Sequence, residues 1–428
     1  MDSYMKIFKD VILMFQNVKK IIFSKIKHVS FQYSKMTFFV RYKSNNVYMD
    51  HILQPQDKIF VLMSGGVDSS VAAALLKSKG LDVVGVFIQS WMQDNNPCAS
   101  QKDFLDVQKV SKVLSMPEPY YVDFSRDYWN FVFQPALDSY KNGYTPNPDV
   151  DCNSYIKFGS LFKKVEKIVQ EKYSNCNRWW VATGHYAAVK TYIPTSLSHL
   201  LRSKDMNKDQ CLYLSKVSQN SLRRTLFPLS DLTKHEVRTI AKKFLLPTAN
   251  KKESQGLCFV SPNTGRHFAN FLANYLSPQQ LTYVDISTGD VLFVSSDKGI
   301  WSTTIGESSR ISISLTKNKI NKKWFVADKD ASKGIVYLCE GWDNPALMKS
   351  IIYCKSWHWI DPFLEEYGEV TGQIRHRQEP QKCYISKYKN NIVKVEFEKM
   401  QRGIAPGQNV AVWKGKTCLG GGVIDRVE

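Results

Sequence analysis

A short loop containing two glycines is the clearest chemical signal in this sequence. Residues 58–63 form an apolar run typical of a buried β-strand, and a helical pattern begins at Val71. Residues 64–70 between them read SGGVDSS. The glycines allow a tight turn whose N–H groups can approach an anion, and the start of a helix adds positive electrostatic potential there. The pattern predicts a loop that binds phosphate.

The side chains of this loop indicate which phosphate chemistry to expect. Ser64 and Ser69 can donate hydroxyl hydrogen bonds to phosphate oxygens, and Asp68 can hold a Mg²⁺ ion. The lysine that follows the second glycine of a Walker A motif is absent. The loop resembles the pyrophosphate loop of ATP pyrophosphatases, which transfer AMP to a substrate oxygen. An ordinary strand–turn–helix corner is the simpler interpretation, and the complete motif between a strand and a helix disfavours it.

Two cysteines stand in unusual surroundings. The chain has nine cysteines without a CxxC pair, so neither a zinc site nor a disulfide framework is indicated. Cys152 follows a proline-punctuated segment that opens a helix, and Cys258 lies a few residues after Lys251 and Lys252. A helix start and nearby lysines both favour a thiolate. Either cysteine alone is more often a packed thiol, but beside an adenylating loop the two together are candidates for chemistry.

Five motifs in one order give this sequence a family resemblance. They are SGGVDSS at 64–70, TPNPDVDCN at 145–153, ATGHY at 182–186, KDQ at 208–210 and GLCF at 256–259. The series resembles the tRNA-specific 2-thiouridylases, both the bacterial MnmA type and the mitochondrial type. The resemblance extends from about Lys58 to the C-terminus. The five motifs together are specific for this family, whereas any one of them alone would not be.

The resemblance implies ATP-dependent 2-thiolation of the wobble uridine (U34) of mitochondrial tRNAs, with Lys, Glu and Gln acceptors as substrates. AMP is transferred to the C2 oxygen, and sulfur then displaces it. In this scheme Cys258 carries a persulfide, Cys152 attacks or resolves it, and a Cys152–Cys258 disulfide results. The sulfur comes from a donor protein downstream of a cysteine desulfurase. Asp149 is either the general base or, equally well, a carboxylate that caps the helix bearing Cys152.

The same resemblance assigns the binding residues and the cofactors ATP and Mg²⁺. ATP contacts fall on Leu62, Met63, Ser64, Gly65, Gly66, Val67, Asp68, Ser69, Ile88 and Gly184, with Asp68 as the metal ligand. The tRNA contacts fall on Asn147, Pro148, Asp149, Lys208, Asp209, Gln210, Arg375 and His376. We interpret His185 as a structural, hydrogen-bonded residue. Residues 306–310 read GESSR where the family carries GQRKG, and the loss of two cations puts tRNA contact through this loop in doubt.

The elements that must position these residues follow from hydrophobic periodicity. Candidate strands at 82–88 and 179–184 alternate with a helical pattern at 104–114, as in a parallel sheet. After Leu276 short apolar runs replace the helical patterns, for example at 291–294 and 393–398. We therefore predict an α/β parallel-sheet ATP-pyrophosphatase domain at 55–274. A small central β domain at 275–344 and a C-terminal β-barrel at 345–428 follow it.

Composition limits the class of protein and its partners. The 428 residues carry a formal charge of +19, which is expected for a polyanionic partner, although a basic surface and leader give the same excess. No stretch approaches 18 consecutive apolar residues, so no membrane span is predicted. Residues 1–50 hold nine Lys or Arg against three Asp, interleaved with apolar residues. This predicts a mitochondrial transit peptide and a matrix location. A basic RNA-binding arm is the alternative.

Two other functions remain open from the sequence. A non-catalytic RNA-binding protein on a degenerate scaffold would explain the charge without needing both cysteines. Another pyrophosphate-loop enzyme, such as an amide-forming synthetase or a tRNA lysidine synthetase, would leave Cys152 and Cys258 without a role. Pyrophosphate release in the presence of tRNA tests the first alternative, because a non-catalytic RNA-binding protein should release none.

Overall fold

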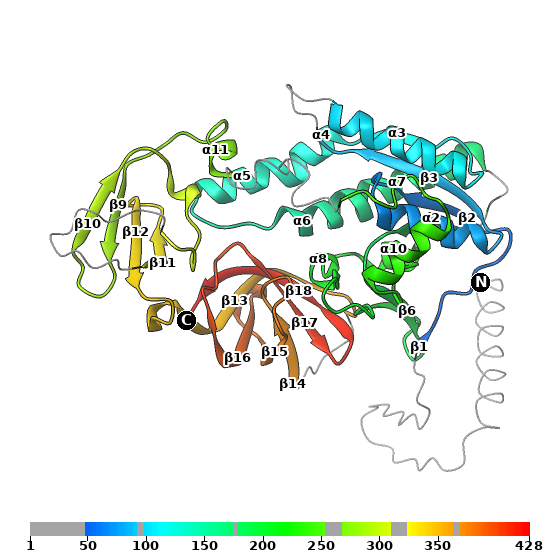
Figure 1. The fold of residues 1–428 in the computed structure, drawn as a ribbon. Coiled ribbons are helices and arrows are strands. Elements are labelled where there is room, and N and C mark those ends of the chain that lie inside the picture. The colour runs from blue at the N-terminus through cyan, green and yellow to red at the C-terminus, as the bar shows by residue number, and fades with distance from the viewer. Residues whose placement is uncertain are drawn as a thin grey trace, which may run out of the picture. The chain divides into compact units, whose positions relative to one another are not determined.

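The first half of the chain builds a parallel sheet covered by helices, and the second half builds β-structure that is antiparallel except for the parallel pair of β9 and β12 (Figure 1). The computed structural model describes residues 48–91, 98–173, 176, 178–252, 268–309, 323–362 and 369–428. The predicted leader up to residue 47, the persulfide candidate Cys258 and the last residue of the divergent loop, Arg310, lie outside them.

The first sheet has five strands, all parallel, in the order β4-β3-β2-β5-β8. Their bounds are β2 (Lys58–Leu62), β3 (Asp82–Gln89), β4 (Tyr120–Asp123), β5 (Trp179–Thr183) and β8 (Thr225–Leu226). Alternate residues of β2 enter different cores, since Phe60 belongs to one buried cluster and Ile59 and Val61 to another. Burial on both faces explains why these strands read as continuous apolar runs.

Helices connect these strands and cover the sheet. The pattern predicted at 104–114 lies in α3 (Cys98–Val113), and the loop 64–66 leads directly into α2 (Val67–Ser78). α10 (Lys234–Lys243) begins with a capping box between Thr233 and Glu236. The remaining helices are α4 (Ser125–Tyr128), α5 (Gln134–Lys141), α6 (Pro148–Asp151), α7 (Leu161–Lys172), α8 (Cys211–Leu214), α9 (Gln219–Leu222) and α11 (Phe268–Leu272), with π-helical turns η1 (Trp129–Phe133) and η2 (Cys152–Ser160).

A four-stranded sheet and a closed barrel follow. The sheet has the order β10-β9-β12-β11, formed by β9 (Leu281–Asp285), β10 (Val291–Ser295), β11 (Trp324–Asp330) and β12 (Ile335–Glu340). The barrel closes because β18 pairs with both β13 and β17. Its strands are β13 (Met348–Trp359), β14 (Glu369–Gln373), β15 (Gln381–Lys387), β16 (Val393–Arg402), β17 (Asn409–Lys414) and β18 (Thr417–Val427). These elements confirm the predicted fold class, while the exact domain boundaries stay predictions.

The barrel is joined to the first half by backbone pairing. Leu200 and Leu201 of β7 (Leu197–Leu201) pair with Cys418 and Thr417 of β18. β7 itself forms a hairpin with β6 (Ala188–Tyr192), whose other edge takes β1 (Tyr48–Met49). The hairpin from the first half of the chain, together with β1, therefore belongs to the same sheet as the barrel strands.

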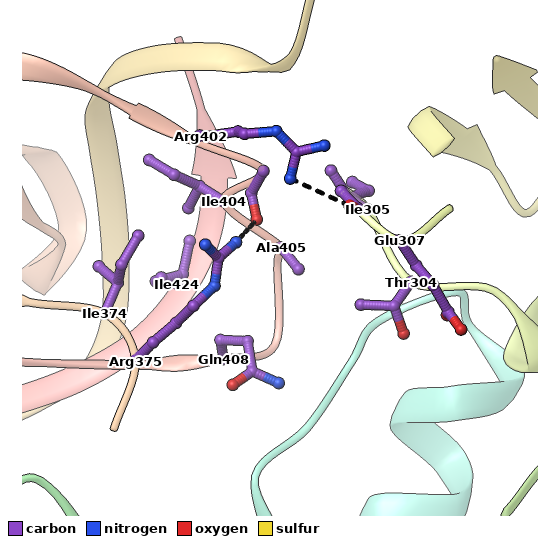
Figure 2. Close-up of a pocket in the computed structure, with 12 residues that line it drawn as sticks. Thr304, Ile305, Glu307, Ile374, Arg375, Arg402, Ile404, Ala405, Gln408 and Ile424 are labelled. Atoms are coloured by element: carbon purple, nitrogen blue, oxygen red, sulfur yellow. Dashed lines mark hydrogen bonds between the residues drawn. The ribbon is translucent and has the colours of Figure 1, made fainter. Parts of the chain in front are cut away.

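The divergent loop at 306–309 is fixed against the barrel by one arginine. Arg402 donates to the carbonyls of Gly306 (3.1 Å) and Trp342 (2.8 Å), and its guanidinium lies 3.5 Å from the centre of the Trp342 ring. Arg402 and Gly306 border a cavity of about 470 Å³, which is also lined by Arg375 and Glu307 (Figure 2). The family's loop cations are lost, but the barrel places two guanidinium groups beside this loop.

Candidate active site

The nucleotide loop lies where three strands end. Leu62 of β2 is paired with Val86 of β3 and with Thr183 of β5. The residues that follow these strands therefore meet at the carboxyl edge of the sheet, where open α/β sheets bind ligands. The edge brings together residues 64–69, Gly184 and the half-buried Ile88 at the end of β3. Most of the predicted ATP contacts are gathered in this way.

The loop holds its own shape through hydrogen bonds. The Ser64 N–H donates to Ser69 Oγ (3.2 Å), and Ser70 Oγ donates to the Gly66 carbonyl (2.8 Å). Gly65 has φ +72°, and a Cβ there would lie 2.6 Å from the Asp103 carbonyl oxygen. Gly66 caps α2 without a side chain, so the first N–H groups of this helix face the loop opening, as an anion site requires.

Gly184 is required by packing as well as by any ligand. A Cβ at this position would lie 2.6 Å from the Ser69 nitrogen and 2.8 Å from the Asp68 carbonyl carbon. The end of β5 and the start of α2 can approach this closely only at a glycine. A contact between Gly184 and ATP stays a prediction.

Asp68, the predicted metal ligand, is already engaged by protein groups. Lys234 Nζ lies 2.7 Å from both of its carboxylate oxygens, and Tyr186 donates its hydroxyl to Oδ1 (3.0 Å). The described residues contain no group of three or more His, Cys, Asp or Glu that could hold a metal. One carboxylate combined with substrate phosphates is nevertheless a usual Mg²⁺ environment. Asp68 fits a metal ion that arrives with ATP, provided that Lys234 releases it.

Tyr186 connects two of the sequence motifs to this loop. Its backbone N–H donates to Gln210 Oε1 (3.0 Å), and the Gln210 N–H donates back to its carbonyl (2.8 Å). The reciprocal pair fixes the backbone of Tyr186, whose hydroxyl reaches Asp68. The ATGHY and KDQ motifs thus help to position the nucleotide loop, whatever they contribute to RNA binding.

A second lysine, Lys251, fixes the other side of the loop. Its ammonium donates to the Gly65 carbonyl (3.0 Å) and to carboxylates of Asp103 and Asp106 (2.7 Å each). Burial would raise the pKa of Asp106, but the hydrogen bond and charge of Lys251 outweigh burial and lower it. Lys251 therefore links the loop to α3, and we call this set of contacts the Lys251 clasp.

Replacing Lys251 with methionine is expected to lower stability by about 1 kcal/mol and to weaken ATP binding, because two carboxylates lose their cation. The lowered pKa of Asp106 makes this stabilisation present at neutral pH and lost as the pH falls through that pKa. Thermal melting at pH 7 and pH 3 measures the loss of stability and its pH dependence, and titration with ATP measures the affinity. Lys252→Met, at the exposed neighbouring position, is the matched control, and equal melting temperatures for the two variants at pH 7 would contradict the clasp.

Cys152 lies near the start of a continuous helical segment formed by α6, η2 and α7. The segment begins at Pro148, so Cys152 is its fifth residue and not its first, and the helix dipole acts on it less strongly than predicted. Cys152 is buried in a cluster with Tyr128 and Phe133, against which Ile88 packs. Cys152 therefore belongs to the apolar cluster against which Ile88, a predicted ATP contact, packs.

Asp149 does not cap this helix. Asn147 occupies the N-cap position, and Asp149 is the second helical residue. Burial raises the pKa of Asp149, while the positive charges of Lys157 and His376 oppose the rise. A carboxyl group with a raised pKa suits general-base chemistry, and the role of Asp149 as the general base stays a prediction.

Among the predicted tRNA contacts, His376 is the barrel residue whose charge acts on Asp149. His376, which follows β14, lies against Tyr213 with ring centres 5.1 Å apart. Burial lowers the pKa of His376, Arg377 and Lys208 lower it further, and Asp209 and Asp149 oppose them. The charges of His376, on the barrel, and Asp149, in the helical segment that carries Cys152, therefore influence each other.

Two of those predicted contacts have inward-facing side chains. Asp209 is 7% exposed and accepts hydrogen bonds from Arg202 (3.2 Å) and from the Ser203 N–H (2.8 Å). The Gln210 side chain accepts a hydrogen bond from the Tyr186 N–H. Arg375 is exposed and donates to the Gly403 carbonyl. Of these residues, Arg375 is the one that presents a charged side chain outward.

His185 has the structural role that the sequence indicated. Its Nδ1 lies 2.9 Å from Thr183 Oγ1, and its ring contacts Phe158 and Phe227. Burial, with a contribution from Lys157, lowers its pKa to about 3. A neutral imidazole at physiological pH agrees with a hydrogen-bonding residue.

Sequence reasoning missed four residues of this site: Lys157, Tyr186, Lys234 and Lys251. Tyr186 stands in a recognised motif, but nothing in the spacing connects it to Asp68. Lys234 follows the Thr233 capping signal, which identifies a helix start without saying what faces it. Only the fold brings Tyr186, Lys234 and Lys251 to the loop and places the charge of Lys157 near Asp149.

Three family models match the chain. They are a tRNA methyl transferase HUP domain at residues 57–262, a tRNA methyl transferase PRC-barrel domain at 269–340, and an aminomethyltransferase β-barrel domain at 349–424. Within the described residues, no helix has both the length and the apolar character needed to cross a membrane.

Curated relatives match over nearly the whole chain. The mitochondrial tRNA-specific 2-thiouridylase 1 of Schizosaccharomyces pombe is 41% identical over 382 residues, covering 87% of this chain and 91% of that protein. The tRNA-specific 2-thiouridylases MnmA of Lacticaseibacillus paracasei and Nitrosomonas europaea are each 39% identical, covering 86% of this chain and 94% and 98% of theirs. With its pyrophosphate loop, its Cys152 segment and this coverage, the chain belongs to the tRNA-specific 2-thiouridylase family.

Proposed function

We propose that this protein is a tRNA-uridine 2-sulfurtransferase that uses ATP to thiolate the wobble uridine (U34) of tRNA. The observation that carries the proposal is the packing of Ile88, at the nucleotide edge of the sheet, against the cluster that buries Cys152. Adenylation and sulfur transfer require these two parts in one site. The activity named for the relatives and the basic charge of the chain support a tRNA substrate.

The proposed reaction has two stages. The uracil C2 oxygen attacks the α-phosphorus of ATP, and pyrophosphate leaves through residues 64–69, whose N–H groups and helix start stabilise its charge. Asp149 accepts the ring proton that is lost as the C2 oxygen becomes nucleophilic. The terminal sulfur of a Cys258 persulfide then bonds to C2, and AMP departs with the oxygen. The Cys152 thiolate then attacks the Cys258 sulfur, which breaks the bond between that sulfur and the one on C2 and leaves the outer sulfur on the base as the thiocarbonyl. An external dithiol returns two electrons to the resulting Cys152–Cys258 disulfide.

The role of Asp149 predicts a pH dependence. Only its ionised form accepts a proton, so the thiolation rate should fall on the acid side as the pH drops through its raised pKa. Lys157 opposes that rise, and Lys157→Met should therefore move the acid limb of the rate profile to higher pH. Single-turnover rates from pH 5 to 8 measure this shift. Lys164→Met, exposed on α7, is the control and should leave the limb in place.

The finer assignments belong to the same proposal. We infer that the substrates are mitochondrial tRNAs with Lys, Glu and Gln acceptors, and that a donor protein downstream of a cysteine desulfurase loads Cys258. We also infer that residues 1–50 direct the chain to the mitochondrial matrix, as the mitochondrial relative suggests. A fluorescent reporter fused to residues 1–50 should enter mitochondria, and a diffuse cytosolic signal would favour the RNA-binding-arm alternative.

The proposed activity is tested with purified protein, ATP, Mg²⁺, unmodified tRNA and a persulfide donor. Mass spectrometry of nuclease digests should show 2-thiouridine at position 34, and pyrophosphate should be released in equal amount. Pyrophosphate release without thiolation would favour another pyrophosphate-loop ligase. Binding of tRNA without pyrophosphate release would favour the non-catalytic RNA-binding protein.

A further inference from the structure

One ammonium group reaches the nucleotide loop from a distant part of the chain. Lys234, the first residue of α10, lies 166 positions after Asp68, and its Nζ is 2.7 Å from both oxygens of that carboxylate. Its side chain is 13% exposed and that of Asp68 is 32% exposed. A flexible lysine held this far inside the site can exchange a carboxylate for another anion over a short distance.

The loop has a chemical need for such a cation. Departing pyrophosphate gains negative charge, and a Walker A loop would meet that charge with its own lysine. Residues 64–70 contain no lysine. The N–H groups at the start of α2 supply partial charges only. A full positive charge must therefore come from elsewhere in the fold or from a metal ion.

Among the described residues, two lysines beside the loop contact different anions. Lys251 is held by the carboxylates of Asp103 and Asp106 and by a loop carbonyl. Lys234 is held by the carboxylate of Asp68, which is itself the candidate ligand of a metal ion arriving with ATP. When Asp68 turns to that ion, the Lys234 ammonium loses its contact with the Asp68 carboxylate. The phosphates of ATP bring other negative charges to the same place.

We propose that Lys234 binds the β- and γ-phosphates of ATP and stabilises the pyrophosphate as it leaves. In the empty loop the lysine holds Asp68, and in the loaded loop it transfers to phosphate oxygens. Lys234 thus supplies from α10 the charge that the loop sequence lacks. The inference rests on the proposed adenylation reaction and assigns a phosphate ligand within it.

Lys234→Met and Lys234→Arg test this role through nucleotide affinity as well as turnover. With the methionine variant, ATP should bind about tenfold more weakly, and tRNA-dependent pyrophosphate release should fall about 100-fold. The affinity for AMP, which lacks both phosphates, should stay within about twofold of wild type. The arginine variant keeps the charge and should recover part of both losses. Lys243→Met, exposed near the end of α10, is the matched control.

The outcomes separate this inference from the proposed function. Equal weakening of ATP and AMP binding would show that Lys234 only supports the shape of the loop, and unchanged ATP binding would also overturn the inference. Both results are read by titration calorimetry and need no turnover. If wild-type protein binds ATP but neither releases pyrophosphate nor thiolates tRNA, the proposed function fails, while the difference between ATP and AMP still decides the role of Lys234.

Discussion

Replacing Cys152 with serine is expected to abolish the formation of 2-thiouridine. A serine hydroxyl cannot attack a persulfide and leave a disulfide, so sulfur transfer should fall below detection. The change is nearly isosteric within the cluster around Tyr128 and Phe133, so the protein should stay folded. Adenylation should continue, because the loop at 64–69 is untouched. Thiolation is read by mass spectrometry of the tRNA, and adenylation by pyrophosphate release.

Cys258→Ser should give the same result, and Cys176→Ser is the control. Cys176 is half-buried and donates its thiol to the Arg178 carbonyl, outside the site described above. After a single turnover, wild-type protein should contain a Cys152–Cys258 disulfide. Thiolation by either serine variant at a rate near that of wild type, or a disulfide between other cysteines, would contradict the proposed relay.

Replacing Asp68 with asparagine is expected to reduce pyrophosphate release and thiolation together, by about 100-fold or more. The amide keeps the shape of the side chain and its hydrogen bond with Tyr186, but it removes the negative charge that faces Lys234 and a metal ion. The loss corresponds to about 2.7 kcal/mol of transition-state stabilisation. Asparagine is preferable to alanine, because alanine would also leave a gap between Lys234 and Tyr186.

The control for this variant is Asp231→Asn, at an exposed position. Melting temperatures of all three proteins establish that the fold is retained. Pyrophosphate release by Asp68→Asn at the wild-type rate would place the nucleotide chemistry elsewhere. Loss of thiolation with unchanged pyrophosphate release would assign Asp68 to the sulfur-transfer stage instead.

Local sequence determined much of the fold. The strands at 58–62 and 82–89, the helix that follows Gly66 and the β-rich second half were predictable because hydrophobic periodicity and glycine positions act over a few residues. The candidate site was predictable where one motif holds several of its residues, as in 64–70 and 145–153. The helix boundary could not be predicted to the residue. The helical segment begins at Pro148, so Cys152 lies a full turn after its N-terminus.

The sequence by itself determined the pyrophosphate loop, the Cys152 segment and the family. Tertiary structure alone decided which charges meet there: Lys234 on Asp68, Lys251 on Gly65, and His376 of the barrel near Asp149. These contacts join residues more than a hundred positions apart. Their geometry depends on sheet register, helix packing and burial, which no local pattern encodes. Burial also turned Asp209 inward and raised the pKa of Asp149, because desolvation belongs to the folded surroundings of a group and not to its neighbours in sequence.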